Sequence, residues 1–219
     1  MREHRLLATR TARYYSLGEP GPATRQLWVV CHGYGQLAGR FLRHFEPLDD
    51  GARVIAAPEG LSRFYLSESA AERRVGASWM TREDRLAEID DYVRYLDAVH
   101  DDVFGFVDRP QVIVHALGFS QGAATASRWT AMGRARVDRL TLWGGEFPPD
   151  LDLTLETVAD RLRAARLSLV YGRSDQFITA KVVTGITERL RAHGISVREI
   201  AFDGGHELSE TVLRELAAS

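Results

Sequence analysis

A serine in the middle of the chain stands in a setting typical of an enzyme nucleophile. Ser120 is the central residue of Gly118 to Gly122, which reads Gly-Phe-Ser-Gln-Gly. An apolar run of strand length precedes this pentapeptide, and an alanine-rich stretch suited to a helix follows it. Glycines on both sides of a sharp strand-to-helix turn let neighbouring backbone approach, so that the serine hydroxyl projects above a sheet. The pattern predicts that Ser120 is a nucleophile. The alternative is a glycine-rich turn kept for packing alone.

A nucleophilic serine needs a base, and two histidines follow it in the chain. His193 precedes Gly194 in what is typical of the last turn of a helix, where a histidine is usually solvated. His206 follows the last apolar run of strand length, in a glycine-containing loop that can carry an imidazole over the nucleophile. We therefore expect His206 to be the base, with a surface loop histidine as the alternative.

Two carboxylates compete for the role of the acid that orients this histidine. Asp175 follows the apolar run Leu167 to Tyr171, and Glu146 follows the run Arg139 to Trp143. Both fit the order serine, acid, histidine that one large class of serine hydrolases uses. The chain between Ser120 and Asp175, and between Asp175 and His206, is long enough for the strands and helices in between. We favour Asp175 and keep Glu146 as its rival, and either could be a solvated carboxylate capping the next helix.

The transition state of such an enzyme carries a negative oxygen that needs two N–H donors. Gly33 and Gly35 flank Tyr34 directly after the first apolar run of the predicted core. The backbone N–H groups of Tyr34 and Gln121 are therefore expected to form the oxyanion hole. The same stretch could instead bind a dinucleotide, but the Gly-x-Gly-x-x-Gly spacing puts Ala38 where the third glycine is expected.

These residues must be positioned by the surrounding elements, and strand-length apolar runs alternate with stretches of helical period. The runs are Leu27 to Cys31, Arg53 to Ala57, Gln111 to Leu117, Arg139 to Trp143, Leu167 to Tyr171 and Val197 to Phe202. The alternation predicts an α/β fold, a mostly parallel sheet with helices on both faces and ligands at the carboxyl ends of the strands. We expect a single domain in which residues 1–25 form a strand pair and residues 26–219 the catalytic core. The stretch Pro58 to Trp79 has no clear period and is expected to be a long loop.

The amino-acid composition argues against several classes of function. The 219 residues are 45% hydrophobic and 26% charged, with a net charge of −2, which argues against binding to nucleic acid. No apolar run approaches the roughly 18 residues of a membrane span, so we expect no stable membrane insertion.

Cys31 is the only cysteine, which excludes an intrachain disulfide and a cysteine-based zinc site. No metal-ligand spacing appears, and we expect a cytoplasmic protein without metal or cofactor. Cys31 and His115 are interpreted as core residues, His115 with its hydrogen bonds satisfied.

The motifs together resemble the phospholipase/carboxylesterase family of α/β-hydrolases, which includes bacterial carboxylesterases and acyl-protein thioesterases. The stretches that carry the likeness are Gly118 to Ala123, His32 to Gly35, Gly172 to Asp175 and Gly205-His206. The resemblance runs from about Gln26 to the C-terminus and implies the α/β-hydrolase fold. It also implies a triad of Ser120, Asp175 and His206, with Tyr34 and Gln121 as oxyanion donors. Ser78 to Met80 is similar to the family's tryptophan segment beside the acyl pocket, although Met80-Thr81 departs from the usual sequence. Leu61 to Val75 has no counterpart that we can match.

Four apolar residues fall on segments expected at the carboxyl edge of the sheet. They are Trp79, Met80, Phe147 and Phe177. We expect them to form the wall of an acyl pocket, with a closed core as the alternative, and we expect Trp79→Ala to shift chain-length preference with little loss of stability. The predicted activity is hydrolysis of small-molecule carboxylic esters of short to medium acyl chains through an acyl-enzyme. Lysophospholipase or acyl-protein thioesterase activity, or a catalytically silent binding module, are the alternatives, and a homodimer is possible.

Overall fold

The protein is built around one seven-stranded sheet. The computed structural model describes residues 1–67, 73–105 and 112–219. In sheet order the strands are β1 (Tyr14–Leu17), β3 (Arg53–Pro58), β2 (Gln26–Cys31), β6 (Ile113–Phe119), β7 (Arg139–Trp143), β8 (Arg166–Gly172) and β9 (Val197–Phe202). All neighbours pair in parallel except β1, which runs antiparallel to β3. The predicted mostly parallel α/β sheet is therefore confirmed. Gln111, the first residue of one expected strand, lies outside the described residues.

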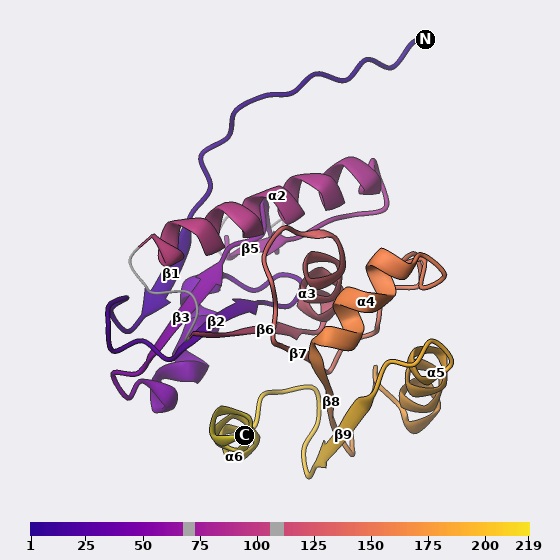
Figure 1. The fold of residues 1–219 in the computed structure, drawn as a ribbon. Coiled ribbons are helices and arrows are strands. Elements are labelled where there is room, and N and C mark those ends of the chain that lie inside the picture. Colours follow the sequence, from indigo (N-terminus) through magenta and orange to yellow (C-terminus); the bar gives the residue numbers. More distant parts are fainter. Residues whose placement is uncertain (68–72, 106–111) are drawn as a thin grey trace.

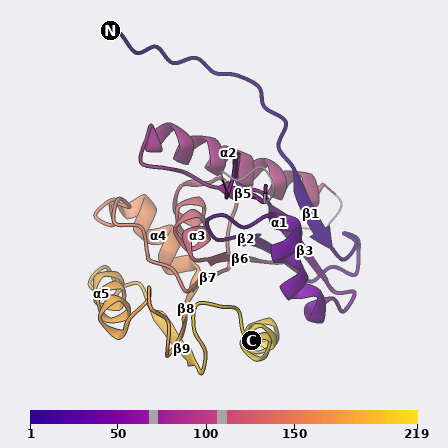
Figure 2. The same cartoon turned by 180° about the vertical axis from the view of Figure 1, so that it is seen from behind.

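Helices cover both faces of this sheet (Figures 1 and 2). The first face carries α2 (Arg85–Phe104), α3 (Gln121–Met132), α4 (Glu156–Ala164) and α5 (Ala180–Arg191). The second face carries the short α1 (Ala38–Phe41), the 3₁₀ segment η1 (Leu42–Leu48) and α6 (Glu210–Ala218). The two cores follow from strand alternation, since Leu27 and Val29 of β2 pack in the first while Trp28 and Val30 pack in the second. None of these helices combines the length and hydropathy that crossing a bilayer requires.

Parallel pairing brings the carboxyl ends of the strands to one edge of the sheet. Cys31 at the end of β2 lies opposite Gly118 of β6, and Phe119 lies opposite Trp143 of β7. The last residue of β8, Gly172, lies opposite Phe202 of β9. The segments that follow these strands are therefore neighbours in space, although they are far apart in the sequence.

The N-terminal region contains one strand rather than the expected strand pair. Residues 1–13 form no helix or strand, and Figure 1 shows this stretch leading away from the sheet. Only β1 pairs, with Tyr14 opposite Pro58 and Leu17 opposite Ile55. The prediction of two strands is wrong because β1 alone occupies the free edge of β3, and the turn that follows β1 leads into β2 instead of back along β1.

The stretch from Pro58 to Trp79 is more ordered than the loop that we expected. It contains two short antiparallel strands, β4 (Ser62–Tyr65) and β5 (Val75–Ser78), joined through residues 68–72, which lie outside the described ranges. This hairpin binds the segment that follows β2. Gly35 N–H donates to the Ala77 carbonyl at 2.9 Å, and Ala77 N–H donates to the Gln36 carbonyl at 3.1 Å. The described part of this hairpin therefore adjoins the carboxyl edge of the sheet through β5.

Candidate active site

Ser120 lies on a strained turn between β6 and α3. Its φ of 54° is in the left-handed region that residues other than glycine rarely adopt. The turn is held by the Ser120 N–H, which donates to the Trp143 carbonyl at 2.8 Å. Side chains are excluded on both sides, because a Cβ at Gly118 would collide with the Gly122 carbonyl and one at Gly122 with the Cys31 carbonyl. This packing presents the serine side chain at the carboxyl edge of the sheet.

His206 joins this serine to a carboxylate. Its Nε2 lies 3.0 Å from Ser120 Oγ, and its Nδ1 lies 2.8 Å from Asp175 Oδ2. The second carboxylate oxygen of Asp175 accepts the N–H groups of Phe177 at 2.8 Å and Ile178 at 3.1 Å. The loops after β8 and β9 thus bring three residues far apart in the sequence into one hydrogen-bonded chain.

The charge of Asp175 suits this chain. Burial by itself would raise the pKa of the carboxyl, but hydrogen bonds with His206 and with two backbone N–H groups outweigh it and hold the pKa below its ordinary value. Asp175 is therefore ionised at neutral pH, and its carboxylate accepts a hydrogen bond from the N–H at Nδ1 of His206. The imidazole then has its lone pair at Nε2, directed toward the serine hydroxyl.

The two rival residues lie elsewhere. Glu146 is exposed beside Phe147 on a shallow hollow of about 240 Å³. Its neighbour Gly144 takes the place beside the imidazole, where a Cβ would lie 3.3 Å from the His206 ring. His193 lies just after α5, where its N–H donates to the Leu190 carbonyl. The residues brought to Ser120 are thus Asp175 and His206.

Two backbone N–H groups belong to segments that adjoin Ser120. Gln121 is the first residue of α3, so its N–H is at the positive end of a helix. Tyr34 is in the segment after β2, which lies against the serine, since a Cβ at Gly33 would be 3.2 Å from Ser120 Cβ. In the described ranges, neither N–H donates to a protein acceptor. Both are available for a substrate oxygen.

His32 sets the orientation of this second segment, a role that the sequence analysis missed. Its Nε2 accepts the Gly60 N–H at 2.9 Å, so its Nδ1 carries the proton and donates to the Gly33 carbonyl at 2.8 Å. Burial lowers the pKa of His32, which keeps the ring neutral and this tautomer in place. Because the Gly33–Tyr34 peptide is trans, the Tyr34 N–H points opposite to the Gly33 carbonyl and away from His32. The histidine directly before Gly33 in the sequence was the signal for this role.

Comparison with known proteins gives matches by structure alone. No family model matches the sequence. No curated protein sequence matches it either. Among solved structures, the Zea mays acyl-protein thioesterase 2 superposes with a TM-score of 0.75 at 19% identity, covering 95% of this chain and 97% of that one. Esterase PE8 superposes with a TM-score of 0.68 at 20% identity and with the same coverage of both chains. The Bacillus cereus carboxylesterase superposes with a TM-score of 0.65 at 14% identity, covering 94% of this chain and 92% of that one. The chain has the α/β-hydrolase fold.

Within this hydrolase fold, Trp79 is a core residue and not an open pocket wall. Its side chain is 1% exposed, and its indole N–H donates to the His32 carbonyl at 2.8 Å. The ring also packs edge-on against Tyr92 of α2. The expectation that Trp79→Ala leaves stability nearly unchanged is therefore wrong, because the ring fills the space between β5, α2 and the segment after β2.

The Gln121 side chain fixes the segment that contains Trp79. Its amide oxygen accepts the Trp79 N–H at 3.1 Å, and its amide nitrogen donates to the Met80 carbonyl at 2.9 Å. The same nitrogen lies 3.1 Å from Ser78 Oγ. The side chain of the residue after Ser120 thus holds the segment from Ser78 to Met80 in place beside α3.

The other three residues expected in the pocket have different surroundings. Met80 is half-buried, with its sulfur 3.7 Å from Arg128 Nη1. Phe147 is buried, and the Arg189 guanidinium lies 5.1 Å from the centre of its ring. Phe177 is 67% exposed, and its ring meets the His206 ring edge-on at 4.8 Å. Of the four, Phe177 offers the most exposed apolar surface next to the reacting atoms.

Proposed function

We propose that the protein is a serine hydrolase that cleaves small-molecule carboxylic esters of short to medium acyl chains through an acyl-enzyme. The observation that carries the proposal is the hydrogen-bonded chain from Asp175 through His206 to Ser120 Oγ, on a turn with two N–H groups beside it. The esterases and the acyl-protein thioesterase with the same fold support the class of reaction.

The geometry accounts for each proton transfer. Ser120 Oγ attacks the acyl carbonyl while His206 Nε2 takes the hydroxyl proton, and Asp175 stabilises the imidazolium that forms. The carbonyl oxygen becomes an oxyanion that the N–H groups of Tyr34 and Gln121 bind. The intermediate then expels the alkoxide, which receives the proton from Nε2. Water, deprotonated by the same nitrogen, releases the acid and restores Ser120. No step in this scheme requires a metal or an organic cofactor.

The preference for short to medium chains rests on what fills the space beside the serine. Trp79 and Phe147 are packed in the core, whereas Phe177, which contacts His206, and Tyr34, in the segment after β2, are exposed. Tyr34 is 60% exposed and its ring lies 5.1 Å from the Phe64 ring of the β4–β5 hairpin. An acyl chain would lie between these exposed rings on a shallow surface. Thioesters and lysophospholipids are the alternative substrates of the same three residues.

A series of nitrophenyl esters of increasing acyl length, beside one acyl thioester and one lysophospholipid, tests the proposal, with Ser120→Ala as the control. Each methylene that contacts the site should raise kcat/KM up to roughly fourfold, the equivalent of about 0.8 kcal/mol, until the surface is covered. We expect this gain to stop at medium chains. If none of these substrates is hydrolysed, the result would favour a silent binding module. A preference for the thioester or the lysophospholipid would select that alternative substrate.

A further inference from the structure

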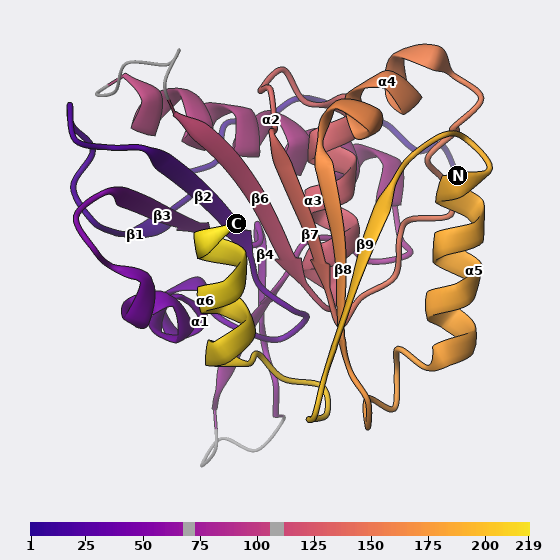
Figure 3. The ribbon, with the colours of Figure 1, turned by 60° about the horizontal axis from the view of Figure 1, so that its bottom comes forward.

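A second site lies at the opposite edge of the sheet, at the amino ends of the strands. A groove of about 450 Å³ opens there on the face that carries α6. Figure 3 shows α6 in front of this face near β2, with β7, β8 and β9 further along the sheet and not covered by a helix in this view. Residues that line the groove include His115, Arg139, Arg166, Ser168 and Leu216. Ester hydrolysis uses none of them.

Two guanidinium groups in this groove have no carboxylate partner among the described residues. Arg139 begins β7 and Arg166 begins β8, and the two are direct partners in the register of the sheet, so their side chains leave the same face. Like charges placed directly opposite one another repel. In the part of the chain that the structure describes, neither forms an ion pair.

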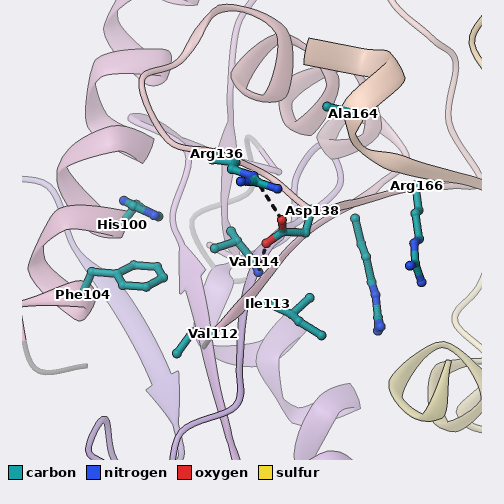
Figure 4. Close-up of a pocket in the computed structure, with 10 residues that line it drawn as sticks. His100, Phe104, Val112, Ile113, Val114, Arg136, Asp138, Ala164 and Arg166 are labelled. Carbon is teal, nitrogen blue, oxygen red and sulfur yellow. Dashed lines mark hydrogen bonds and ion pairs between the residues drawn. The ribbon is translucent and has the colours of Figure 1, made fainter. Parts of the chain in front are cut away.

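The nearest carboxylate in sequence is already engaged. Asp138 precedes Arg139, but its two oxygens accept the Val114 N–H at 2.9 Å and meet the Arg136 guanidinium at 3.4 Å. Figure 4 shows Asp138 between these two partners, with Arg166 apart from them. Asp138 therefore forms no ion pair with Arg139 or Arg166, and its charge acts on Arg139 only as a longer-range attraction that burial and the repulsion from Arg166 outweigh.

Two buried nitrogen atoms at the same place have no hydrogen-bond partner among the described residues. They are Nη1 of Arg139 and Nδ1 of His115. His115 is opposite Arg139 in register and 1% exposed, and its Nε2 lies 2.8 Å from Thr141 Oγ1. The expectation that this core histidine has all its hydrogen bonds satisfied is thus wrong for Nδ1. Buried polar groups in proteins are nearly always paired, so these two nitrogens mark a place where partners are missing.

The charge state of His115 decides how many of its ring nitrogens carry a proton. Burial, together with the positive charge of Arg139, lowers the pKa of His115 to about 3, so the ring is neutral at physiological pH. When the Thr141 hydroxyl donates to Nε2, the single ring proton lies on Nδ1. His115 and Arg139 then both present N–H donors without an acceptor.

We propose that this groove binds the phosphate group of a phosphomonoester, held by the guanidinium groups of Arg139 and Arg166 with His115 beside them. A phosphate dianion matches two positive charges that have no ion-pair partner among the described residues, and its oxygens accept the paired N–H groups of guanidinium. The groove has room for more than the phosphate. The half-buried Ser168 offers a hydroxyl to the organic part of such a ligand.

Isothermal titration calorimetry at constant ionic strength tests the proposal with three probes: inorganic phosphate, glycerol 3-phosphate, and vesicles that contain phosphatidic acid. We expect a dissociation constant of about 1 mM or lower for a soluble probe or for the vesicles. Binding of glycerol 3-phosphate would identify a soluble ligand, and binding of the vesicles alone would identify a lipid headgroup.

The variants Arg139→Gln and Arg166→Gln should each weaken this binding roughly tenfold or more. Arg94→Gln, which removes a charge from α2 on the other face, is the matched control and should bind like the parent. Arg166 is exposed, so its variant keeps the test valid if Arg139→Gln does not fold. Absence of binding by all three probes, or an equal loss in Arg94→Gln, would overturn the proposal.

Discussion

Asp175 positions the imidazole of His206 through a carboxylate that is itself fixed by two backbone N–H groups. Asp175→Asn keeps the shape of this residue but presents an amide that favours the wrong imidazole tautomer. We predict that kcat on a short-chain nitrophenyl ester falls by about 10⁴, while folding is retained. Glu146→Gln is the matched control and should change kcat by less than about twofold, because Glu146 is exposed and its substitution removes no buried contact. A reversed result would assign the acid to Glu146.

His32 offers a second test of a single residue, because one of its ring nitrogens donates a hydrogen bond and the other accepts one. In His32→Asn the amide nitrogen can replace Nδ1 as donor to the Gly33 carbonyl, whereas in His32→Gln the amide oxygen can replace Nε2 as acceptor from Gly60. We predict that His32→Gln lowers kcat by up to about 100-fold through the misplaced Tyr34 N–H, and that His32→Asn lowers it much less. Urea unfolding of both variants checks their stability. Equal values of kcat in the two would show that His32 only fills space.

The sequence was enough to propose the three reacting residues but not the groups that support them. The Ser120 turn is a local motif with a strand before it and a helix after it, so its conformation follows from adjacent residues. Asp175 could be separated from Glu146 only by three-dimensional packing, in which Gly144 lies against His206. The pairing of Arg139 with Arg166 depends on strand register, which no local pattern of the sequence specifies.

Among the elements, the segment from Ser78 to Met80 is held between α3, α2 and the segment after β2. Removing the Trp79 ring would leave a cavity in this packing and an unpaired His32 carbonyl. We predict that Trp79→Ala lowers the free energy of unfolding by about 3 to 5 kcal/mol, as measured by urea denaturation. Phe177→Ala, which removes an exposed ring from the same edge, should cost less than about 0.5 kcal/mol. Similar stability of Trp79→Ala and the parent would contradict the core position of Trp79.

Glu59 joins three elements at the end of β3. Its buried side chain meets Arg13 at 2.7 Å before β1 and Arg63 at 3.1 Å on β4, and it also accepts the Ala38 N–H at 3.3 Å. Burial would raise the pKa of this carboxyl, but the two arginines and the N–H outweigh burial and hold the pKa below its ordinary value. The stabilisation is therefore complete above the ordinary pKa and is lost as the pH falls below it.

From this charge state we predict that Glu59→Gln lowers the free energy of unfolding by about 1 to 3 kcal/mol at neutral pH. Urea denaturation at about pH 7 and about pH 3 should show the difference between parent and variant shrinking at the lower pH, which is below the ordinary pKa at which Glu59 takes up a proton in the unfolded chain. A difference that grows at low pH would mean that Glu59 is protonated in the folded protein.

Most of the six parallel strands were predictable because they are apolar runs buried on both faces of the sheet, whereas the edge strand β9 contains the exposed Arg198 and Glu199. The short strands were not. β1, β4 and β5 have four residues each, too few for a periodic pattern, and each forms because a partner edge is available. The β4–β5 hairpin in particular depends on its bonds to the segment after β2, which brings it to the rim of the site.

At the scale of the whole molecule, the two edges of the sheet differ in chemistry. The carboxyl edge gathers Ser120, His206 and Asp175, as expected for a parallel sheet with helices on both faces. The amino edge gathers arginines at the starts of β7 and β8. The first arrangement follows from the alternation of strands and helices in the sequence. The second does not, because it depends on which part of one sheet face α6 leaves uncovered.

The proposed nucleophile is tested most directly by the mass of the intact protein after reaction with a fluorophosphonate. The reagent bonds to a serine whose hydroxyl is activated by a neighbouring base, so reaction reports the Ser120–His206 pair itself. We predict one adduct per chain in the parent protein and none in a folded Ser120→Ala variant. An unlabelled parent, or a Ser120→Ala variant labelled to the same extent, would contradict the assignment of Ser120 as the nucleophile.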